Sequence, residues 1–423
     1  MKDFEKITLD NGLRVILAPL SSVMSTTAIV LCGAGSRYET KPTNGISHFL
    51  EHMFFKGTNR RPSASEISHE LDSIGADYNA FTGKEATGYH IKSASKHLPL
   101  ILDMLADMLW NSKFDAAEIE KERGVIIEEL NMYEDTPMRK VAEVYEALLW
   151  GDQPLGWEIG GRKENIRTIA HKDFMDLISA RYAPNNMVVA LAGNFKKAEA
   201  LSLIKKHYAH QKPHDVSGFS AARDIQKKPA VSAFYKKTDQ AHLVLGVRGI
   251  KLVHPNRYTA AVLATILGGG MSSRLFINVR EKRGLAYYVN ASNESYLDTG
   301  TFCASAGVDL KRIDEAIEVI LAEFSQIASE KVSERELKKA KEYIKGKVIL
   351  SWEDSRTVAF AYGADELMEG RVRPLKDYLK LIDEVKAEDI RRLAQFLFAH
   401  SKLNLAVIGP FKDKERFQKI LKL

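Results

Sequence analysis

Apolar and polar positions along the chain alternate between two periods, one typical of strands and one typical of helices. Short runs rich in β-branched residues predict strands, and longer runs with apolar residues three and four apart predict helices. The expected strands cover 13–19, 25–35 and 85–95, and the expected helices cover 44–56, 64–74, 98–110 and 115–133. The residues Asp10-Asn11-Gly12 predict a hairpin turn before the first of these strands. Hairpins interleaved with helices indicate an α+β fold with antiparallel sheets packed by helices.

The second half of the chain repeats the pattern of the first. Matching segments lie about 212–218 residues apart, as in 86–95 with 298–307, 114–132 with 332–350, and 186–208 with 402–423. Between the copies, 211–230 has two prolines and weak periodicity, which is typical of a linker. We therefore expect two homologous domains, 1–210 and 231–423, joined by a linker at 211–230.

Composition supports two globular domains and excludes several classes of protein. The chain has 423 residues, of which 45% are apolar and 27% charged, and a net charge of +6 spread among acidic residues. No basic stripe for nucleic acid and no apolar run of membrane-spanning length is present in the sequence. Cys32 and Cys303 do not suggest a disulfide framework, and the first residues lack the apolar core of a signal peptide. We expect a cytoplasmic protein without nucleic-acid or membrane partners.

One predicted helix carries polar groups where its pattern predicts a buried face. Residues 45–58 (GISHFLEHMFFKGT) place His48, Glu51 and His52 within five positions. Burying such groups without partners costs several kcal/mol, so a hydrogen-bond network or a metal ion is expected. Residues four apart share one helix face, so His48 and His52 can reach one ion. Two imidazoles suit zinc, and Glu51 at the edge of that face can contact a water on the metal without ligating it.

The helix expected at 115–133 offers a third ligand. Glu122, Ile126, Glu129 and Tyr133 share one stripe of this helix, whereas Glu128 falls on a more polar face. We predict Glu129 as the ligand and Glu122 as a carboxylate that orients a metal-bound imidazole. Spacing alone leaves Glu128 as the alternative ligand.

The repeat serves as an internal control for this site. The segment that corresponds to the His48 helix reads AAVLATILGGG (260–270), and Glu122 and Glu129 correspond to Ala340 and Lys347. Groups that one copy lacks are not needed to form the fold. The comparison therefore favours a dedicated site in the first half.

These motifs together resemble the pitrilysin (insulinase-like) family of metallopeptidases. H-x-x-E-H is the inverted zincin motif, and here it is followed by EKERGVIIEELNMYEDTP (120–137). The chain is most similar to the short branch that includes the mitochondrial processing peptidase β-subunit. The resemblance implies two α+β domains that form half of a clamshell. It also implies one Zn²⁺ held by His48, His52 and Glu129, with Glu51 as general base and Glu122 as a supporting acid.

The resemblance extends to residues that would contact a peptide. Arg280 and Tyr287, in GGGMSSRLFINVREKRGLAYYV (268–289), match the family's substrate-binding arginine and tyrosine. Apart from the resemblance, a surface arginine and a core tyrosine are the favoured interpretation of these two residues. Asn79 and Ala80, in NAFTGKEATGYH (79–90), match the family's edge strand, to which an extended peptide adds as a further strand.

The resemblance therefore implies a zinc metalloendopeptidase that cleaves peptides or unfolded segments enclosed in a chamber. Because the zinc and Arg/Tyr motifs both occur in a two-domain chain, we expect a homodimer, with a heterodimer with a related chain as the alternative. A second interpretation is a non-catalytic scaffold or partner subunit of a peptidase-like complex. The intact His48, Glu51, His52 and Glu129 set argues against it.

Overall fold

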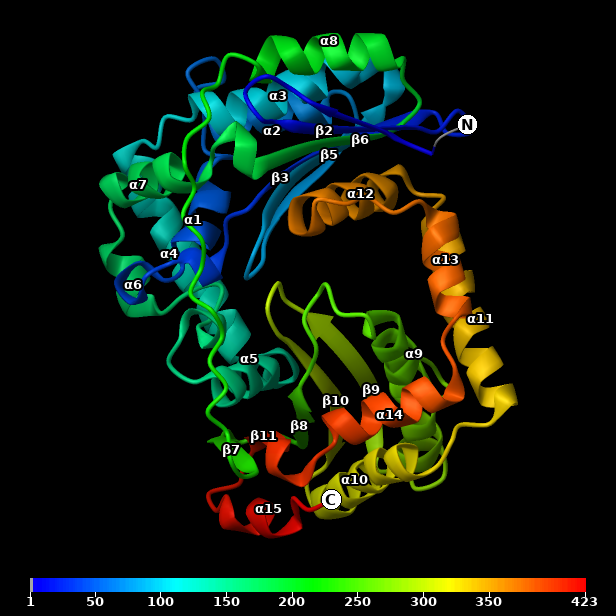
Figure 1. Cartoon of the computed structure of the whole chain (residues 1–423). Coiled ribbons are helices and arrows are strands. Elements are labelled where there is room, and N and C mark those ends of the chain that lie inside the picture. Colours follow the sequence, from blue (N-terminus) through cyan, green and yellow to red (C-terminus); the bar gives the residue numbers. More distant parts are fainter. Residues whose placement is uncertain (1–2) are drawn as a thin grey trace. The chain divides into compact units, whose positions relative to one another are not determined.

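The computed structural model describes residues 3–423, and within them the chain forms two compact units, each built around one β-sheet (Figure 1). Both units are assembled from separate stretches of the chain. Unit 1 contains 1–130, 157–220 and 349–374, and unit 2 contains 131–156, 221–348 and 375–423.

The sheet of unit 1 has six strands in the order β1-β2-β6-β3-β5-β4. Its strands are Glu5–Thr8 (β1), Arg14–Pro19 (β2), Ser25–Cys32 (β3), Asp77–Thr82 (β4), Thr87–Ala94 (β5) and Met187–Gly193 (β6). Neighbouring strands are antiparallel except β2 and β6, which are parallel. The central strand β6 is buried along its whole length, as its continuous apolar sequence predicts. Strand β4 lies at the edge of the sheet.

Helices pack against this sheet. In unit 1 they are Ile46–Met53 (α1), Ala64–Asp72 (α2), Leu98–Asn111 (α3), most of Ala116–Glu134 (α4), Lys163–Thr168 (α6), His171–Arg181 (α7), Lys197–Tyr208 (α8) and Ser355–Glu369 (α12). Helix α3 packs against β3 and β5, and α1 against β4. Helix α12 covers β3 and β6 with Val358, Ala359 and Tyr362, in one apolar cluster with residues of those strands (Figure 1).

The sheet of unit 2 repeats the strand order of the first, β7-β11-β8-β10-β9. Its strands are Ala230–Tyr235 (β7), Gln240–Arg248 (β8), Ala286–Ser295 (β9), Gly300–Asp309 (β10) and Asn404–Gly409 (β11). The parallel pair β7/β11 corresponds to β2/β6, and the other neighbours are antiparallel. Only β1 lacks a counterpart among the described strands. This correspondence of order and direction is what a duplicated fold predicts.

The helices of unit 2 follow the same plan. They are Pro137–Trp150 (α5), Arg257–Gly268 (α9), Ile313–Ser329 (α10), most of Glu334–Ser351 (α11), Leu375–Asp383 (α13), Ala387–Leu397 (α14) and Glu415–Ile420 (α15), with a π-helix at Phe276–Glu281. Helix α5, from the first half of the chain, packs on β8 and β11 through Val141, Tyr145 and Leu149. Helices α5 and α12 follow α4 and α11 in the two copies, so each copy contributes a helix to the sheet of the other.

The fold class expected from the sequence is confirmed. The strands and helices predicted in the first half are all present, with ends that differ by at most three residues. Each sheet, however, contains one parallel pair, because its buried central strand returns from a helical crossover rather than from a hairpin. The domain limits 1–210 and 231–423 are those of a sequence repeat. Each compact unit of the fold contains segments from both halves of the chain, so the units do not test these limits, which stay a prediction. None of the helices within residues 3–423 combines the length and the apolar character needed to cross a bilayer.

Candidate metal centre

The turn at which helix α1 begins is held by the carboxylate of Glu39, six residues before Gly45. Gly45, at the N-cap, has φ +101°, a left-handed conformation, and a Cβ there would meet the carbonyl oxygen of Gly160 at 2.7 Å. Without a side chain to cap the helix, its first N–H groups bond to Glu39 instead. Glu39 Oε2 accepts from the Gly45 N–H at 2.8 Å, and Oε1 accepts from the Ser47 N–H at 2.8 Å. Burial raises the pKa of Glu39, and these bonds oppose the rise.

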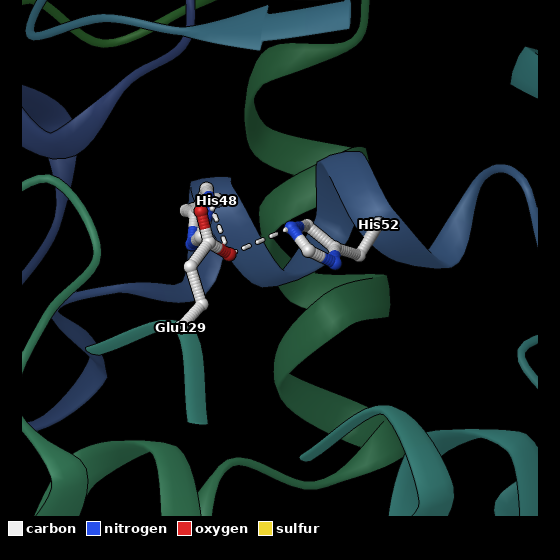
Figure 2. A group of neighbouring side chains, drawn as sticks. All are labelled: His48, His52 and Glu129. Carbon is white, nitrogen blue, oxygen red and sulfur yellow. Dashed lines mark ion pairs between the residues drawn. The ribbon is translucent and has the colours of Figure 1, made fainter. Parts of the chain in front are cut away.

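Two helices bring His48, His52 and Glu129 together. The histidines lie one turn apart on α1, and Glu129 reaches them from α4, as Figure 2 shows. One oxygen, Glu129 Oε2, lies 3.5 Å from His48 Nε2 and 3.4 Å from His52 Nε2. The three side chains are only partly buried, with exposed fractions of 12%, 21% and 22%. The cluster is therefore reachable from outside the core of unit 1.

A second carboxylate orients His52 from behind. Glu122 Oε1 lies 2.8 Å from His52 Nδ1, and Glu122 also pairs with Lys56. Burial alone would lower the pKa of His52, but its bonds to Glu122 and Glu129 outweigh burial and raise that pKa to about 9. Burial would raise the pKa of Glu122, and the bonds from His52 and Lys56 lower it instead. The site thus favours a positive charge at His52 and keeps Glu122 ionised.

Glu51 lies on the same helix as the histidines but turns to a different partner. Its Oε2 accepts a hydrogen bond of 2.5 Å from Thr82 Oγ1, at the end of edge strand β4. Burial raises the pKa of Glu51, with the Thr82 bond opposing the rise. A half-buried carboxylate with an elevated pKa has the properties of a general base.

The donor set fits zinc. His48, His52 and Glu129 offer two imidazole nitrogens and one carboxylate oxygen, all within 4.8 Å of one another. Tetrahedral zinc with bonds of about 2.0–2.1 Å places its ligand atoms about 3.3 Å apart, which is close to the two nitrogen–oxygen distances found here. Glu122, hydrogen-bonded to His52, is a carboxylate of the kind that usually supports a zinc-bound imidazole.

The structure distinguishes the two candidate glutamates of α4. Glu129 lies in the cluster, whereas Glu128 is exposed. Three residues that sequence reasoning missed support the site: Glu39, Lys56 and Thr82. Only Lys56 has a sequence signal, since it follows His52 by one helical turn.

The residues expected to contact a peptide belong to two different units. Asn79 is exposed and Ala80 half-buried on edge strand β4 of unit 1. Arg280 and Tyr287 belong to unit 2, where the Arg280 guanidinium donates to the Tyr287 carbonyl oxygen at 2.7 Å. The Tyr287 side chain is exposed. The roles of these four residues stay predictions.

Comparisons with known proteins match most of the chain to one peptidase family. Residues 14–162 match the model of the insulinase family (peptidase family M16), and residues 168–344 match that of the peptidase M16 inactive domain. The chain is 35% identical over 406 residues to the uncharacterised zinc protease YmxG of Bacillus subtilis, covering 96% of this chain and 98% of that protein. It is 33% identical over 421 residues to an uncharacterised zinc protease of Mycobacterium leprae, covering 99% and 94%.

Solved structures show the same fold. A protease from Helicobacter pylori superposes with a TM-score of 0.90 at 25% identity, covering 96% of this chain and 99% of that one. A chain of complex III2 from Candida albicans superposes with a TM-score of 0.84 at 20% identity, covering 99% and 100%, which shows likeness of fold alone. On the family models and the full-length relatives together, the chain belongs to the insulinase (M16) family of peptidases.

Proposed function

We propose that this protein is a zinc-dependent endopeptidase. The observation that carries the proposal is the convergence of His48, His52 and Glu129, whose donor atoms lie within 4.8 Å of one another beside Glu51. Relatives named as zinc proteases and aligned along nearly the whole chain support it. Besides Glu129 and Glu122, a third acid, Glu51, lies at the edge of the same helix face. A purely structural cluster would not need it.

The chain's own residues divide the work of peptide hydrolysis. When bound by His48, His52 and Glu129, zinc would act as a Lewis acid toward the scissile carbonyl and make water a better nucleophile near neutral pH. Glu51 accepts the proton of the attacking water and passes it to the leaving amine. Glu122 fixes the ring of His52 through Nδ1 at 2.8 Å, which leaves Nε2 for the metal.

Two pairs of residues are proposed to contact the substrate. The place of β4 at the sheet edge supports pairing with an extended peptide, with Asn79 and Ala80 as contact positions; the Ala80 N–H, which donates to Asn79 Oδ1 at 2.8 Å, would exchange that partner for the peptide. Arg280 would donate to a substrate carbonyl, and the Tyr287 hydroxyl would stabilise the negative oxygen that develops during attack. The π-helix that carries Arg280 is consistent with this role, since such helices recur at functional sites.

The decisive experiment uses a matched pair of variants on helix α4. Purified wild type is expected to contain about one zinc per chain and to cleave members of a peptide library, and a chelator should abolish cleavage. Glu129→Gln removes one ligand and should lose zinc and activity, while Glu128→Gln, one residue away and exposed, should keep both. Glu51→Gln should keep zinc and lower kcat about 10²–10⁴-fold. Cleavage that is insensitive to chelator would overturn the zinc mechanism.

The finer proposal is a homodimer in which Arg280 and Tyr287 serve the zinc site of the partner chain, the two chains together forming a closed chamber. Its support is the presence of both motifs in a two-domain chain. Mixing Glu51→Gln chains with Tyr287→Phe chains should restore part of the activity, because one of the two sites in the mixed dimer then has both intact groups. Mixed dimers that form without regaining activity would contradict this arrangement.

We place the protein in the cytoplasm, consistent with its two free, buried cysteines.

A further inference from the structure

Glu51 receives its hydrogen bond from the strand at the sheet edge. Thr82 is the last residue of β4, and its hydroxyl lies 2.5 Å from Glu51 Oε2 and 3.4 Å from the carbonyl oxygen of Ser47. A hydroxyl has one proton to donate, and a carboxylate is the stronger acceptor. The short bond to Glu51 is therefore the one that governs the Thr82 side chain.

The hydroxyl is fixed in place by the strand that carries it. Thr82 pairs with Thr87 of β5, and the turn between them is closed by a Gly83 N–H to Ala86 carbonyl bond of 2.8 Å. Threonine is also branched at Cβ, which restricts rotation about χ1. The position of Oγ1 thus follows from the backbone of β4.

One segment, Ser36–Glu39, ties this turn to helix α1. The Ser36 and Arg37 N–H groups donate to the carbonyl oxygens of Gly83 and Lys84 at 3.2 and 2.9 Å. At the other end of the segment, Glu39 holds the first N–H groups of α1. Strand β4 and helix α1 are therefore held by the same four-residue segment, Ser36–Glu39, which fixes Thr82 and Glu51 relative to each other.

The bond determines which carboxylate oxygen is available. The last side-chain torsion of glutamate is broad, so an unrestrained carboxylate rotates easily. Thr82 occupies Oε2, and among residues 3–423 no hydrogen bond reaches Oε1. With Oε2 held by Thr82, Glu51 presents one defined oxygen, Oε1, to the reacting atoms as the proton acceptor.

We propose that Thr82 is a positioning residue, whose hydroxyl holds the Glu51 carboxylate in the orientation for proton transfer. The inference rests on the proposed role of Glu51 as general base and adds to it. It links two parts of the site, because the strand that orients the base is also the strand expected to receive the peptide. Thr82 would act on the chemical step, and the backbone at the outer edge of β4 on binding.

The test compares three variants with the same peptide. The probe is an internally quenched peptide of about ten residues, chosen as the library member that wild type cleaves fastest. Thr82→Val removes the hydroxyl and keeps the shape, and Thr82→Ser keeps the hydroxyl. Thr87→Val is the matched control, because Thr87 lies opposite on β5 and its hydroxyl donates to the Ala34 carbonyl oxygen at 3.0 Å rather than to Glu51.

Thr82→Val should lower kcat by about 10-fold or more while leaving KM within about 2-fold, as expected for a change felt only in proton transfer. Zn²⁺ affinity, measured by competition with a chromophoric chelator, and binding of the labelled peptide to zinc-free protein should match wild type. Thr82→Ser should recover most of kcat, and Thr87→Val should keep it.

Equal kcat for Thr82→Val and wild type would overturn this inference alone. So would a loss of kcat in Thr82→Ser as large as that in Thr82→Val. A loss in Thr82→Val that is confined to KM, peptide binding or zinc affinity would overturn it as well. If Thr82→Val does not fold, Thr82→Ala and Thr82→Ser give the same comparison. A wild-type chain that binds zinc but cleaves no peptide would overturn the proposed function, and the role of Thr82 with it.

Discussion

His52 is held between two carboxylates that do different things. Glu129 Oε2 lies 3.4 Å from its Nε2, on the side of the cluster, while Glu122 bonds to Nδ1 at 2.8 Å from the opposite side. Glu122 is almost fully buried and also pairs with Lys56. The bond to Glu122 therefore sets the ring plane of His52 and keeps Nδ1 protonated, so Nε2 is the nitrogen left for a metal.

Replacing Glu122 by Gln should weaken zinc binding without removing a ligand. The amide can still accept a hydrogen bond from His52 Nδ1, but it no longer carries the negative charge that supports the ring. We expect Zn²⁺ affinity to fall about 10–100-fold, measured by chelator competition. Glu118→Gln is the control, since Glu118 lies on the same helix and, within residues 3–423, its ion pair is with exposed Lys121 at 3.6 Å. Wild-type affinity in Glu122→Gln would show that this acid does not support the metal site.

At this scale the sequence predicted the cluster and the acid Glu122 beside it, but missed the supporting residues Glu39, Lys56 and Thr82. The spacing of His48 and His52 and the stripe of α4 that contains Glu129 are local helical patterns, which a sequence displays directly. Thr82 and Glu39 contact α1 only because a turn and an edge strand pack beside it. Such contacts depend on tertiary packing, which local periodicity does not encode.

Among the secondary-structure elements, α1 is held at both ends. Its first turn bonds to Glu39, and the segment that follows it is clamped to α3 by a buried ionic cluster. Asp107 of α3 is fully buried and accepts from Thr58 Oγ1 at 2.6 Å, Arg61 at 2.8 Å and Arg60 Nε at 2.9 Å. An eight-residue helix is marginal alone, so these two anchors, together with its buried apolar face, keep the ligands in place.

This clamp predicts how unit 1 responds to acid. Burial opposes the charge of Asp107, but the bonds from Thr58 and Arg61 outweigh burial and lower the pKa of that carboxyl below its usual value of about 3.8. A carboxyl whose pKa is lower in the folded than in the unfolded state stabilises the fold at every pH above its unfolded-state pKa. This stability is lost as the pH falls through the folded-state pKa. We expect the urea midpoint, followed by circular dichroism, to fall steeply below about pH 4.

Asp107→Asn should flatten that acid dependence and lower the stability at pH 7 by about 3 kcal/mol, because two arginines lose a buried partner. Asp176→Asn is the control, since its pair with Lys172 is exposed and should matter little. An unchanged midpoint and an unchanged acid slope in Asp107→Asn would mean that the cluster does not stabilise the unit.

The whole molecule is organised by an exchange that sequence patterns do not reveal. Residues 137–150 and 355–369 form the helices α5 and α12, and local periodicity does not indicate the sheet on which each packs. In the fold, α12 covers β3 and β6 and α5 covers β8 and β11. The duplication is thus visible in the sequence, whereas the reciprocal exchange of its helices is a property of the folded chain.

The exchange predicts that neither half of the chain folds well alone. A fragment of residues 1–220 lacks α12, so it would expose the apolar face that includes Ile29, Leu31 and Val188. Each such side chain contributes about 1.5–3 kcal/mol when buried, so losing several of these contacts exceeds what a unit of this size can spare. We expect this fragment alone to aggregate or to bind a hydrophobic dye.

Co-expression with residues 221–423 should rescue the fragment, because α12 then packs on its sheet and α5 on the partner sheet. The two fragments should co-purify in a 1:1 complex that binds Zn²⁺ with the affinity of the intact chain, measured by the same chelator competition. Cutting the intact chain within 211–220 by an inserted protease site is the control, and it should leave the complex assembled. A fragment 1–220 that is monomeric, binds no dye and holds zinc as tightly as the full chain would show that α12 is dispensable. The metal centre would then belong to the first half of the sequence rather than to a unit completed by the second.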